Sequence, residues 1–409
     1  MLARWLGLAA LAAVAASLTG CGESSSSANE AVGSQLTVYS SLPLQGPLAL
    51  ISRQLVGGEK LALAAARGRV GHYRIAYDSL DDSNTTNGRW SAGETASDAK
   101  MAAQDTSTIA YIGDYDSGAT AISLQFINEA GIPQVSPSSP YIGLTSSLDA
   151  GQDEPERFYP DGHRTFVRLG PSDALQAEAQ ARLMVSLGVH KLYILDNEDP
   201  FELPLAALVG SDAQAAGITL AGHDHVSVTA GASFKGEAEK IRESGADAVF
   251  FAGTGTEGAA LMWQQMHEVD PSLLLLGPSS LAEEDEFAPM LGAAAEKTYL
   301  TTPALPARFY PPAARLVLSH YSKQFGGTPS AYVLYGYESM ALVLGAIRRA
   351  GSHADDRARV VQALLSAHVR NSVLGRYEVE PDGETTLNRF AVDRVVAGQP
   401  VFYKELEVG

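Results

Sequence analysis

Apolar residues in the first part of the chain follow two alternating periods. Short runs that alternate apolar and polar residues, or are apolar throughout, are typical of β-strands, and longer stretches with apolar residues three or four positions apart are typical of α-helices. The expected strands are 35–39, 73–77, 108–113 and 132–135, and the expected helices are 48–66, 92–104 and 119–130. Strands that alternate with helices indicate a parallel sheet with helices on both faces.

The same alternation resumes at residue 165. Its expected strands are 165–169, 191–195, 218–228, 248–252 and 273–276, and its expected helices are 174–187, 203–216, 238–244 and 258–269. After Pro303 the pattern changes to helices at 313–325, 331–350 and 357–366 and then to antiparallel strands at 375–379, 389–396 and 401–406. Because the alternation occurs in two separate runs, the sequence predicts an α/β protein with two doubly wound parallel-sheet lobes.

The N-terminus has the features of a secretion signal. Arg4 precedes Trp5–Ala16, in which every residue is apolar or Gly, and such a run is too short to span a bilayer comfortably. It ends in Leu18-Thr19-Gly20-Cys21, which resembles the lipobox of bacterial lipoproteins. The resemblance implies a signal peptide at 1–20, lipidation of Cys21, and a Ser-rich tether at 21–34. We therefore expect an extracytoplasmic protein of the periplasm or cell surface that contacts the membrane through its lipid anchor only.

Composition narrows the class of protein further. The chain has 409 residues, of which 45% are hydrophobic and 19% charged, as in ordinary globular proteins. Cys21 is the only cysteine, so neither a disulfide scaffold nor a thiolate metal site is expected. The 47 acidic and 29 basic residues give a net charge of −18, which repels phosphate backbones and argues against nucleic-acid binding.

A glycine motif at Gly253–Gly258 matches G-x-G-x-x-G between an expected strand and an expected helix. A dinucleotide site would also need an acid at the end of the next strand, but 273–276 is followed by Gly277-Pro278-Ser279. We interpret the motif as a tight turn into a helix. The sequence also lacks G-x-S-x-G, H-E-x-x-H and the Walker A motif, so we expect no enzyme activity, no catalytic residue and no cofactor.

Two groups of polar residues contain side chains of the kinds that bind metal ions. His223 and His225 flank Asp224 on one strand, which places both imidazoles on the same face. Two histidines are too few for a metal site, so we expect a polar strand edge and no bound metal; a surface hydrolase that uses His223 and Asp224 is a less favoured alternative. The carboxylates at Asp78, Asp81 and Asp82 lack calcium-loop spacing and are expected in a solvated turn.

Polar loops follow the expected strands of both lobes. Ligands of parallel α/β sheets bind beyond the carboxyl ends of the strands. The loops with hydroxyl groups, free helix N–H groups or an aromatic residue are 40–48, 113–120, 136–141, 196–201, 253–255 and 277–280. Their joint placement predicts a small polar ligand enclosed between the lobes.

Six segments together resemble the leucine/isoleucine/valine-binding branch of the type 1 periplasmic binding proteins, the substrate-binding proteins of branched-chain amino acid ABC transporters. In order, they are Leu42–Leu48, Gly57–Ala62, Tyr77–Asp81, Ile112–Ser117, Ile132–Pro137 with Leu144-Thr145, and Tyr335–Glu338. The resemblance implies lobes of 35–164 plus 304–374 and 165–303 plus 375–409, joined by a three-stranded hinge that closes on a ligand. It also implies a monomer whose partners are a small polar solute and an ABC-transporter permease.

The resemblance also assigns binding residues. Ser117 and nearby backbone N–H groups would hold a ligand carboxylate, and Phe201 would cover the ligand from the second lobe. The complete set of implied ligand-binding residues is Ser117, Ser138, Ser139, Phe201, Thr254, Ser279 and Tyr332.

The sequence departs from the amino-acid-binding pattern at two positions. Pro140 replaces a Thr that accepts the ligand ammonium, and Ser279 replaces an acid. An ammonium without a carboxylate partner loses about 1.5–3 kcal/mol, which argues against a zwitterionic amino acid and leaves amides and small carboxylates open. Any missing charge would come from an acid in the same loops, Asp116, Asp199 or Glu202. A sensory receptor of the same fold, coupled to a signalling partner, is the other alternative.

Overall fold

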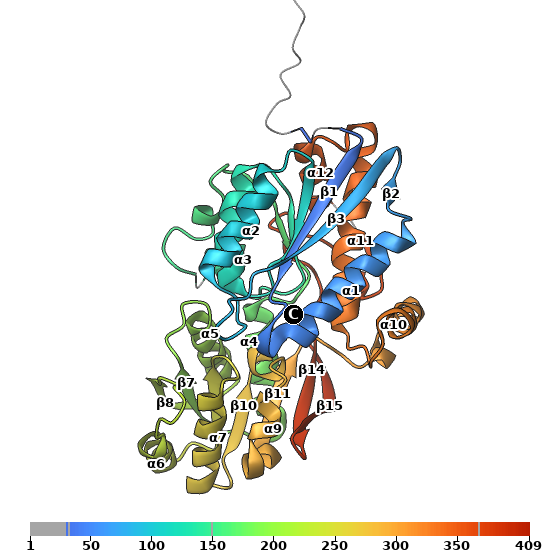
Figure 1. The fold of residues 1–409 in the computed structure, drawn as a ribbon. Helices are drawn as coiled ribbons and strands as arrows, with labels where there is room; N and C mark the ends of the chain where they lie inside the picture. Colours follow the sequence, from blue (N-terminus) through green and yellow to red (C-terminus); the bar gives the residue numbers. More distant parts are fainter. Residues whose placement is uncertain (1–29, 32, 149, 367–368) are drawn as a thin grey trace, which may run out of the picture.

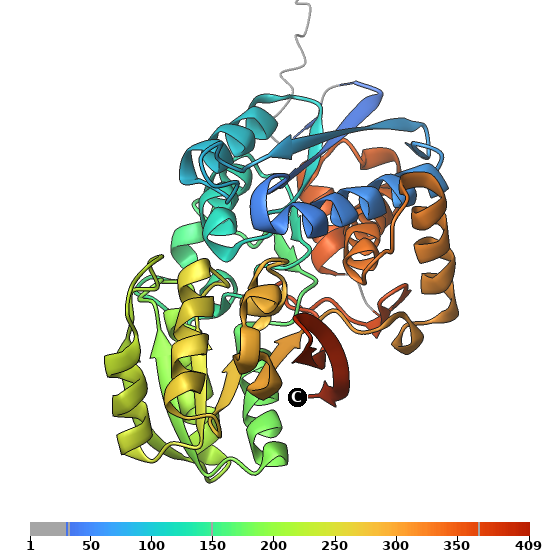
Figure 2. The same cartoon turned by 60° about the horizontal axis from the view of Figure 1, so that its bottom comes forward.

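The structure is a computed structural model that describes residues 30–31, 33–148, 150–366 and 369–409. It contains two lobes, one above the other in Figure 1, and the turned view in Figure 2 shows the chain crossing between them. The expected signal peptide, Cys21 and most of the tether lie outside the described residues. Within the described part, no helix is both long and apolar enough to cross a membrane.

The first lobe is built on a six-stranded sheet in the order β2-β3-β1-β4-β5-β6. All neighbouring pairs are parallel except the β2–β3 hairpin. The strands are β1 (Gln35–Leu42), β2 (Arg69–Val70), β3 (Tyr73–Asp81), β4 (Thr108–Ile112), β5 (Gln134–Ser136) and β6 (Phe166–Arg168).

Side-chain alternation along β1 explains why helices cover both faces of this sheet. Val38 packs in the core on one face, and Tyr39 packs in a separate cluster on the other. The face with Val38 is covered by α1 (Ala49–Ala65), α10 (Pro312–Phe325), α11 (Tyr332–Ala350) and α12 (Arg357–Leu365). The face with Tyr39 is covered by α2 (Ala92–Gln104) and α3 (Ser117–Glu129).

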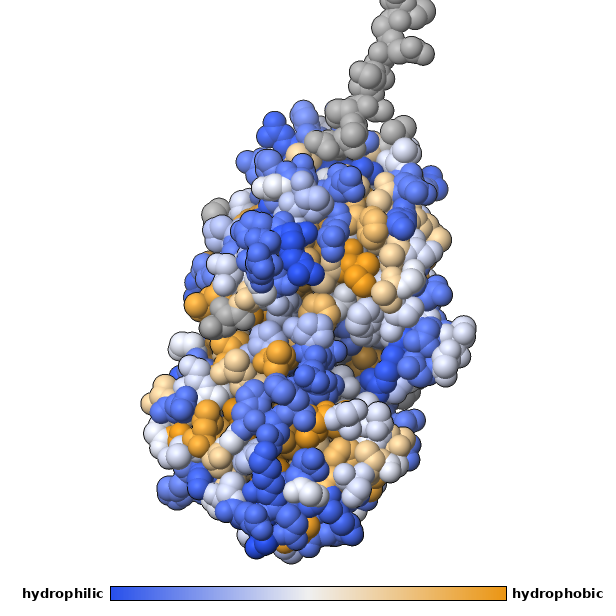
Figure 3. Space-filling view, turned by 90° about the vertical axis from the view of Figure 1, so that its left-hand side faces the viewer, coloured by the Kyte–Doolittle hydropathy of each residue, from blue (hydrophilic) through white to orange (hydrophobic). Residues whose placement is uncertain are grey.

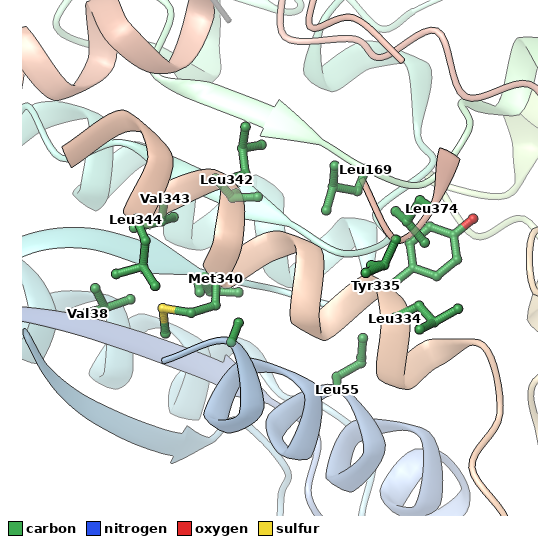
Figure 4. Close-up of a cluster of buried hydrophobic side chains, with 14 of the residues drawn as sticks. Val38, Leu55, Leu169, Leu334, Tyr335, Met340, Leu342, Val343, Leu344 and Leu374 are labelled. Atoms are coloured by element: carbon green, nitrogen blue, oxygen red, sulfur yellow. The ribbon is translucent and has the colours of Figure 1, made fainter. Parts of the chain in front are cut away.

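Helices α1 and α11 approach each other unusually closely. A Cβ atom at Gly58 would lie 2.1 Å from the Val333 carbonyl oxygen, and one at Gly336 would lie 2.0 Å from that of Leu55. Glycine is therefore required on both helices. The close approach buries leucine and aromatic side chains of α11 against α1 and β1 (Figure 4).

The second lobe contains a seven-stranded sheet in the order β15-β14-β11-β10-β9-β7-β8, in which only β14 and β15 run antiparallel to their neighbours. Its strands are β7 (Lys191–Asp196), β8 (Thr219–His225), β9 (Ala248–Ala252), β10 (Leu274–Gly277), β11 (Thr298–Thr302), β14 (Arg389–Val396) and β15 (Gln399–Glu407). One face packs on α4 (Asp173–Leu187) and α5 (Leu203–Ala215), and the other on α6 (Lys235–Ser244), α7 (Glu257–Val269), α8 (Ser279–Ala282) and α9 (Phe287–Met290).

Two of the predicted strands belong to different sheets from those expected. The strand at 165–169 was expected to open the second lobe, but β6 pairs with β5 at the edge of the first sheet. The strand at 375–379 was expected to join the C-terminal strands, but β13 (Gly375–Tyr377) pairs with β12 (Arg370–Ser372) in a separate hairpin. The lobe boundaries at 164/165 and 374/375 therefore shift to positions after β6 and after β13. Apolar pattern identifies a buried strand but carries no information about its partner.

Candidate functional site

A cavity of about 100 Å³ lies between the two lobes. Its first-lobe wall comes from the start of α1, the loop before α2, the start of α3 and the loop after β5, and its second-lobe wall from segments after β6, β7, β9 and β10. Most of these segments follow the carboxyl ends of parallel strands, where such folds bind ligands. Outside the cavity, hydrophilic residues cover most of the face in Figure 3, and its hydrophobic residues lie in small groups.

The structure brings most of the implied binding residues to this cavity. Those in its lining are Ser117, Ser138, Phe201, Thr254 and Ser279. Ser117 begins α3, where the first backbone N–H groups have no partner within the helix. Its Oγ accepts a hydrogen bond from the Tyr141 N–H at 3.1 Å, which fixes its position at the wall.

Ser139 and Tyr332 lie behind the cavity wall. Ser139 has a positive φ of 49°, and its Oγ lies 2.6 Å from Thr120 Oγ1 and donates to the Asp114 carbonyl oxygen at 2.9 Å. The Tyr332 hydroxyl donates to the carboxylate of Glu283, which does line the cavity. Tyr332 therefore does not line the cavity itself, but it contacts Glu283, which does.

Six carboxylic acids line the cavity, and sequence reasoning named only half of them as candidates. They are Asp116, Asp173, Asp199, Glu202, Glu283 and Glu284. Among the described lining residues there is no lysine, arginine or histidine. Glu283 and Glu284 were missed because they follow β10 within a run of four acidic residues, and such a run in a sequence is indistinguishable from a solvated surface loop.

Burial changes the proton affinity of these acids. Desolvation raises the pKa of Asp116, Asp173 and Glu283 to about 7. Desolvation, reinforced by the charge of Asp173, raises the pKa of Glu202 to about 8. The cavity therefore holds carboxyl groups that gain or lose protons near neutral pH.

Two of the acids connect the lobes directly. Arg89, in the loop before α2, donates from both terminal guanidinium nitrogens to Glu284 at 2.5 and 2.7 Å. Glu283 accepts from the hydroxyls of Tyr115 and Tyr332 in the first lobe. These interlobe contacts hold the two walls of the cavity together.

Two aromatic side chains and a glycine form an apolar part of the wall. A Cβ at Gly118 would lie 2.5 Å from the Trp90 ring and 2.9 Å from the Phe201 ring. Phe201 also packs edge-on against Tyr141, with ring centroids 5.3 Å apart. Phe201 from the second lobe thus contacts first-lobe residues at the cavity, with both ring systems available to a ligand.

The rejected motifs have structural roles. In the glycine motif, a Cβ at Gly258 would lie 2.2 Å from the Val228 carbonyl oxygen, and the Thr256 hydroxyl caps α7 by accepting from the Ala259 N–H at 3.1 Å. This geometry agrees with a tight turn into a helix. The solvated turn expected at the three aspartates is wrong: Asp78 and Asp81 belong to β3, where Asp81 accepts from the Leu44 N–H at 3.0 Å, and Asp82 is fully buried.

His223 and His225 lie outside the cavity lining, near the C-terminal end of β8 and beside β7. Both rings contact the buried carboxylate of Asp196, at 2.5 Å from His223 Nε2 and 2.8 Å from His225 Nδ1. Asp224 points to the opposite side of the strand, where it pairs with Lys240 at 2.6 Å. Asp224 is therefore not placed to act with either histidine.

The fold and the interlobe cavity define a two-lobed ligand-binding protein. The chain matches the family model for periplasmic binding proteins over residues 40–399, and it belongs to that family. Leu/Ile/Val-binding protein homolog 3 of Brucella melitensis is 24% identical over 363 residues, which cover 87% of this chain and 90% of that protein. The predicted resemblance is therefore confirmed.

Solved structures confirm the predicted fold. A leucine-binding protein from Thermotoga maritima superposes with a TM-score of 0.74 at 21% identity, covering 91% of this chain and 99% of the other. A solute-binding protein of an ABC transporter from R. palustris, in complex with benzoate, superposes with a TM-score of 0.72 at 15% identity, covering 91% and 97%. At these identities the likeness concerns the fold alone.

Proposed function

We propose that this protein captures a small polar solute between its lobes by hinge closure and delivers it to the permease of an ABC importer. It would work outside the cytoplasm as a monomer, anchored through a lipid on Cys21. The observation that carries the proposal is the cavity itself, which both lobes enclose at the carboxyl ends of their strands. Relatives with the same fold are named for binding leucine and for a complex with benzoate.

The size of the cavity supports a small solute. A water-sized group needs roughly 10–15 Å³ of such space, so a cavity of about 100 Å³ holds on the order of seven to ten non-hydrogen atoms. This is the size class of an amino acid, a short amine or a small aromatic acid. Oligosaccharides and peptides are too large.

The contacts between the lobes support closure as the binding mechanism. Arg89 and Glu284 belong to different lobes, so their bidentate pair forms only when the lobes are together. A solute that contacts both walls stabilises this closed arrangement, because an open form would leave half of its contacts unmade. Closure also removes water from the solute, and no bond is made or broken.

The proposed ligand contacts are the lining residues Ser117, Ser138, Phe201, Thr254 and Ser279. The test begins with a thermal-shift screen of amino acids, amines, amides and aromatic acids, since a solute that binds only the native state raises the unfolding temperature. Calorimetry on the best hit should then show Ser117→Ala binding at least fivefold more weakly. Ser147→Ala, on an exposed loop, is the matched control and should bind normally. No hit in the screen, or unchanged affinity in Ser117→Ala, contradicts the proposed site.

A further inference from the structure

The charge balance of the interlobe cavity is incomplete. Arg89 compensates Glu284, and two tyrosine hydroxyls satisfy Glu283. Four further acids, from both walls, have no cation bonded to them in the described part of the chain: Asp116, Asp173, Asp199 and Glu202. Of these, Asp199 accepts a hydrogen bond from the Phe201 N–H at 2.8 Å.

The evidence for a missing counter-charge is strongest at Asp173. It is only 3% exposed, it lines the cavity, and no described side chain or backbone N–H hydrogen-bonds to its carboxylate. Across the cavity, the Oδ2 atom of Asp116 is fully buried and also has no hydrogen-bond partner among the described residues. Buried carboxylates without partners cost several kcal/mol unless a counter-charge is supplied. Both groups thus lack a partner that a ligand can provide.

The nearest positive charges are already committed. Arg89 is held by Glu284, and Arg168 lies behind the wall, where it pairs with Glu384. Arg168 lowers the pKa of Asp173 and Arg89 lowers that of Asp116, yet desolvation outweighs both effects and the net shift is upward. The protein's own cations therefore do not neutralise the cavity.

We propose that the solute is a small organic cation with net positive charge, such as a diamine or a guanidino-amine, whose nitrogens pair with Asp173 and Glu202 in one lobe and Asp116 in the other. This inference rests on the proposed function and specifies its ligand. Trp90 and Phe201 favour the same class, because aromatic faces attract cations and cover methylene groups.

The proposal revises the ligand expected from the sequence. Asp116 precedes Ser117 at the start of α3, so its carboxylate repels a ligand carboxylate bound to Ser117. In the second-lobe wall, Asp173 and Glu202 supply the acidic groups that Ser279 lacks. A ligand such as benzoate, which carries only a negative charge, is repelled most strongly by the acids of the cavity. A zwitterionic amino acid is repelled at its carboxylate end.

The experiment is calorimetry at pH 8 with agmatine and putrescine, compared with leucine and 4-hydroxybenzoate. We expect a cation to bind at least 100-fold more tightly than either comparison ligand. Asp173→Asn and Glu202→Gln should each weaken its binding at least tenfold, and the exposed control Asp161→Asn should not. The unfolding temperature of ligand-free Asp173→Asn should equal or exceed that of the parent at pH 8, whereas a residue with only a structural role would lower it.

The outcomes separate the inference from the proposed function. Tight binding of leucine or 4-hydroxybenzoate that is lost in Ser117→Ala overturns the cationic ligand and leaves solute capture standing. Binding of neither cation, or cation binding that both acid variants retain, also overturns the inference. Failure of the whole solute screen, by contrast, contradicts solute capture itself.

A second cluster of polar side chains lies on β7 and β8, away from the cavity. His223, His225 and Asp196 offer two ring nitrogens and a carboxylate oxygen that lie within 4.8 Å of one another. The third group was not recognised in the sequence because it lies on the neighbouring strand, where register places Asp196 opposite His225. Nitrogen and carboxylate ligands of this kind bind Zn²⁺.

We infer a second site here, for Zn²⁺ or a similar divalent transition metal. Asp196 is fully buried, whereas the His223 and His225 side chains are 37% and 51% exposed, so a metal would keep open positions for water. The Glu198 N–H donates to Asp196 Oδ1 at 2.8 Å and orients the carboxylate. The proposed metal site shares no residue with the cavity lining, so the two sites are independent.

Calorimetry with ZnSO₄ on the full chain tests this site. We expect one binding event that weakens at least tenfold in both His223→Ala and His225→Ala. His190→Ala is the control, because His190 is also exposed and lies beside an aspartate but has no second histidine nearby on its strand. Equal affinity in the parent and His223→Ala, or no zinc binding by the parent, overturns the site.

Discussion

Two buried acidic regions of this molecule differ in how their charge is balanced. In the first, the fully buried Arg168 on β6 pairs with Glu384. Its guanidinium also donates to Ser139 O at 2.7 Å, Tyr141 O at 2.8 Å and Thr145 Oγ1 at 2.6 Å. Burial alone would raise the pKa of Glu384, but the charge and hydrogen bonds of Arg168 outweigh it and lower the pKa.

The second region is the interlobe cavity, where burial dominates and the pKa values of the acids are raised. The Arg168–Glu384 cluster joins β6 to the segment before β14, two places where the chain crosses between the lobes, and it is complete within the protein. Among the described residues that line the cavity there is no lysine, arginine or histidine. Of these two regions, the one with balanced charge connects the lobes, and the one with unbalanced charge lines the cavity.

The largest expected effect comes from breaking the balanced region. Arg168→Met leaves Glu384 buried without its partner, so the free energy of unfolding should fall by about 3–5 kcal/mol. Chemical denaturation measures this loss. Arg182→Met removes an exposed ion pair with Glu178 and should change stability by less than about 1 kcal/mol. Equal losses in the two variants would contradict the role given to Arg168.

The second effect is the dependence of stability on pH, which should come from the unbalanced acids of the cavity. The cavity acids have folded-state pKa values of about 7 to 8 and unfolded values of roughly 4. The folded state therefore binds more protons between these limits, and these groups make the ligand-free protein less stable as the pH rises from 5 to 8. Thermal unfolding across this range should show the decline, and Glu202→Gln should reduce it. A steeper decline in Glu202→Gln than in the parent would contradict the assignment.

The smallest effect concerns the ion pair between Arg89 and Glu284, which connects the lobes. Arg89→Met removes the bidentate contact with Glu284 that the closed form makes, so bound solute should dissociate faster and affinity should fall about tenfold, or ~1.4 kcal/mol. Stopped-flow displacement measures the dissociation rate. Arg157→Met, which removes an ion pair between the exposed Arg157 and Glu154 within one lobe, is the control. An unchanged rate in Arg89→Met would show that this pair does not hold the lobes closed.

Much of the fold could be predicted from the sequence, because apolar periodicity records which face of each element is buried. The helix predicted at 92–104 is α2 without a change of boundary. The strand β11 was missed, and the partners of β6 and β13 were wrong, since pairing depends on contacts between distant segments.

The candidate site was harder to predict than the fold. Ser117 and Phe201 could be placed at the cavity because they belong to loops after recognisable strands. Asp173 and Glu283 could not, because their importance comes from burial without a counter-charge, which no local pattern encodes. Asp196 was also missed, because His223 and His225 lie beside it on the adjacent strand and not near it in the sequence.

The most direct test of the central claim is the number of protons exchanged when a cation binds. Calorimetric titration of agmatine at pH 6.5, in two buffers with different ionisation enthalpies, measures this number. The account predicts net proton release, because a bound cation lowers the raised pKa values of the cavity acids. Proton uptake, or binding without any proton exchange, would contradict it.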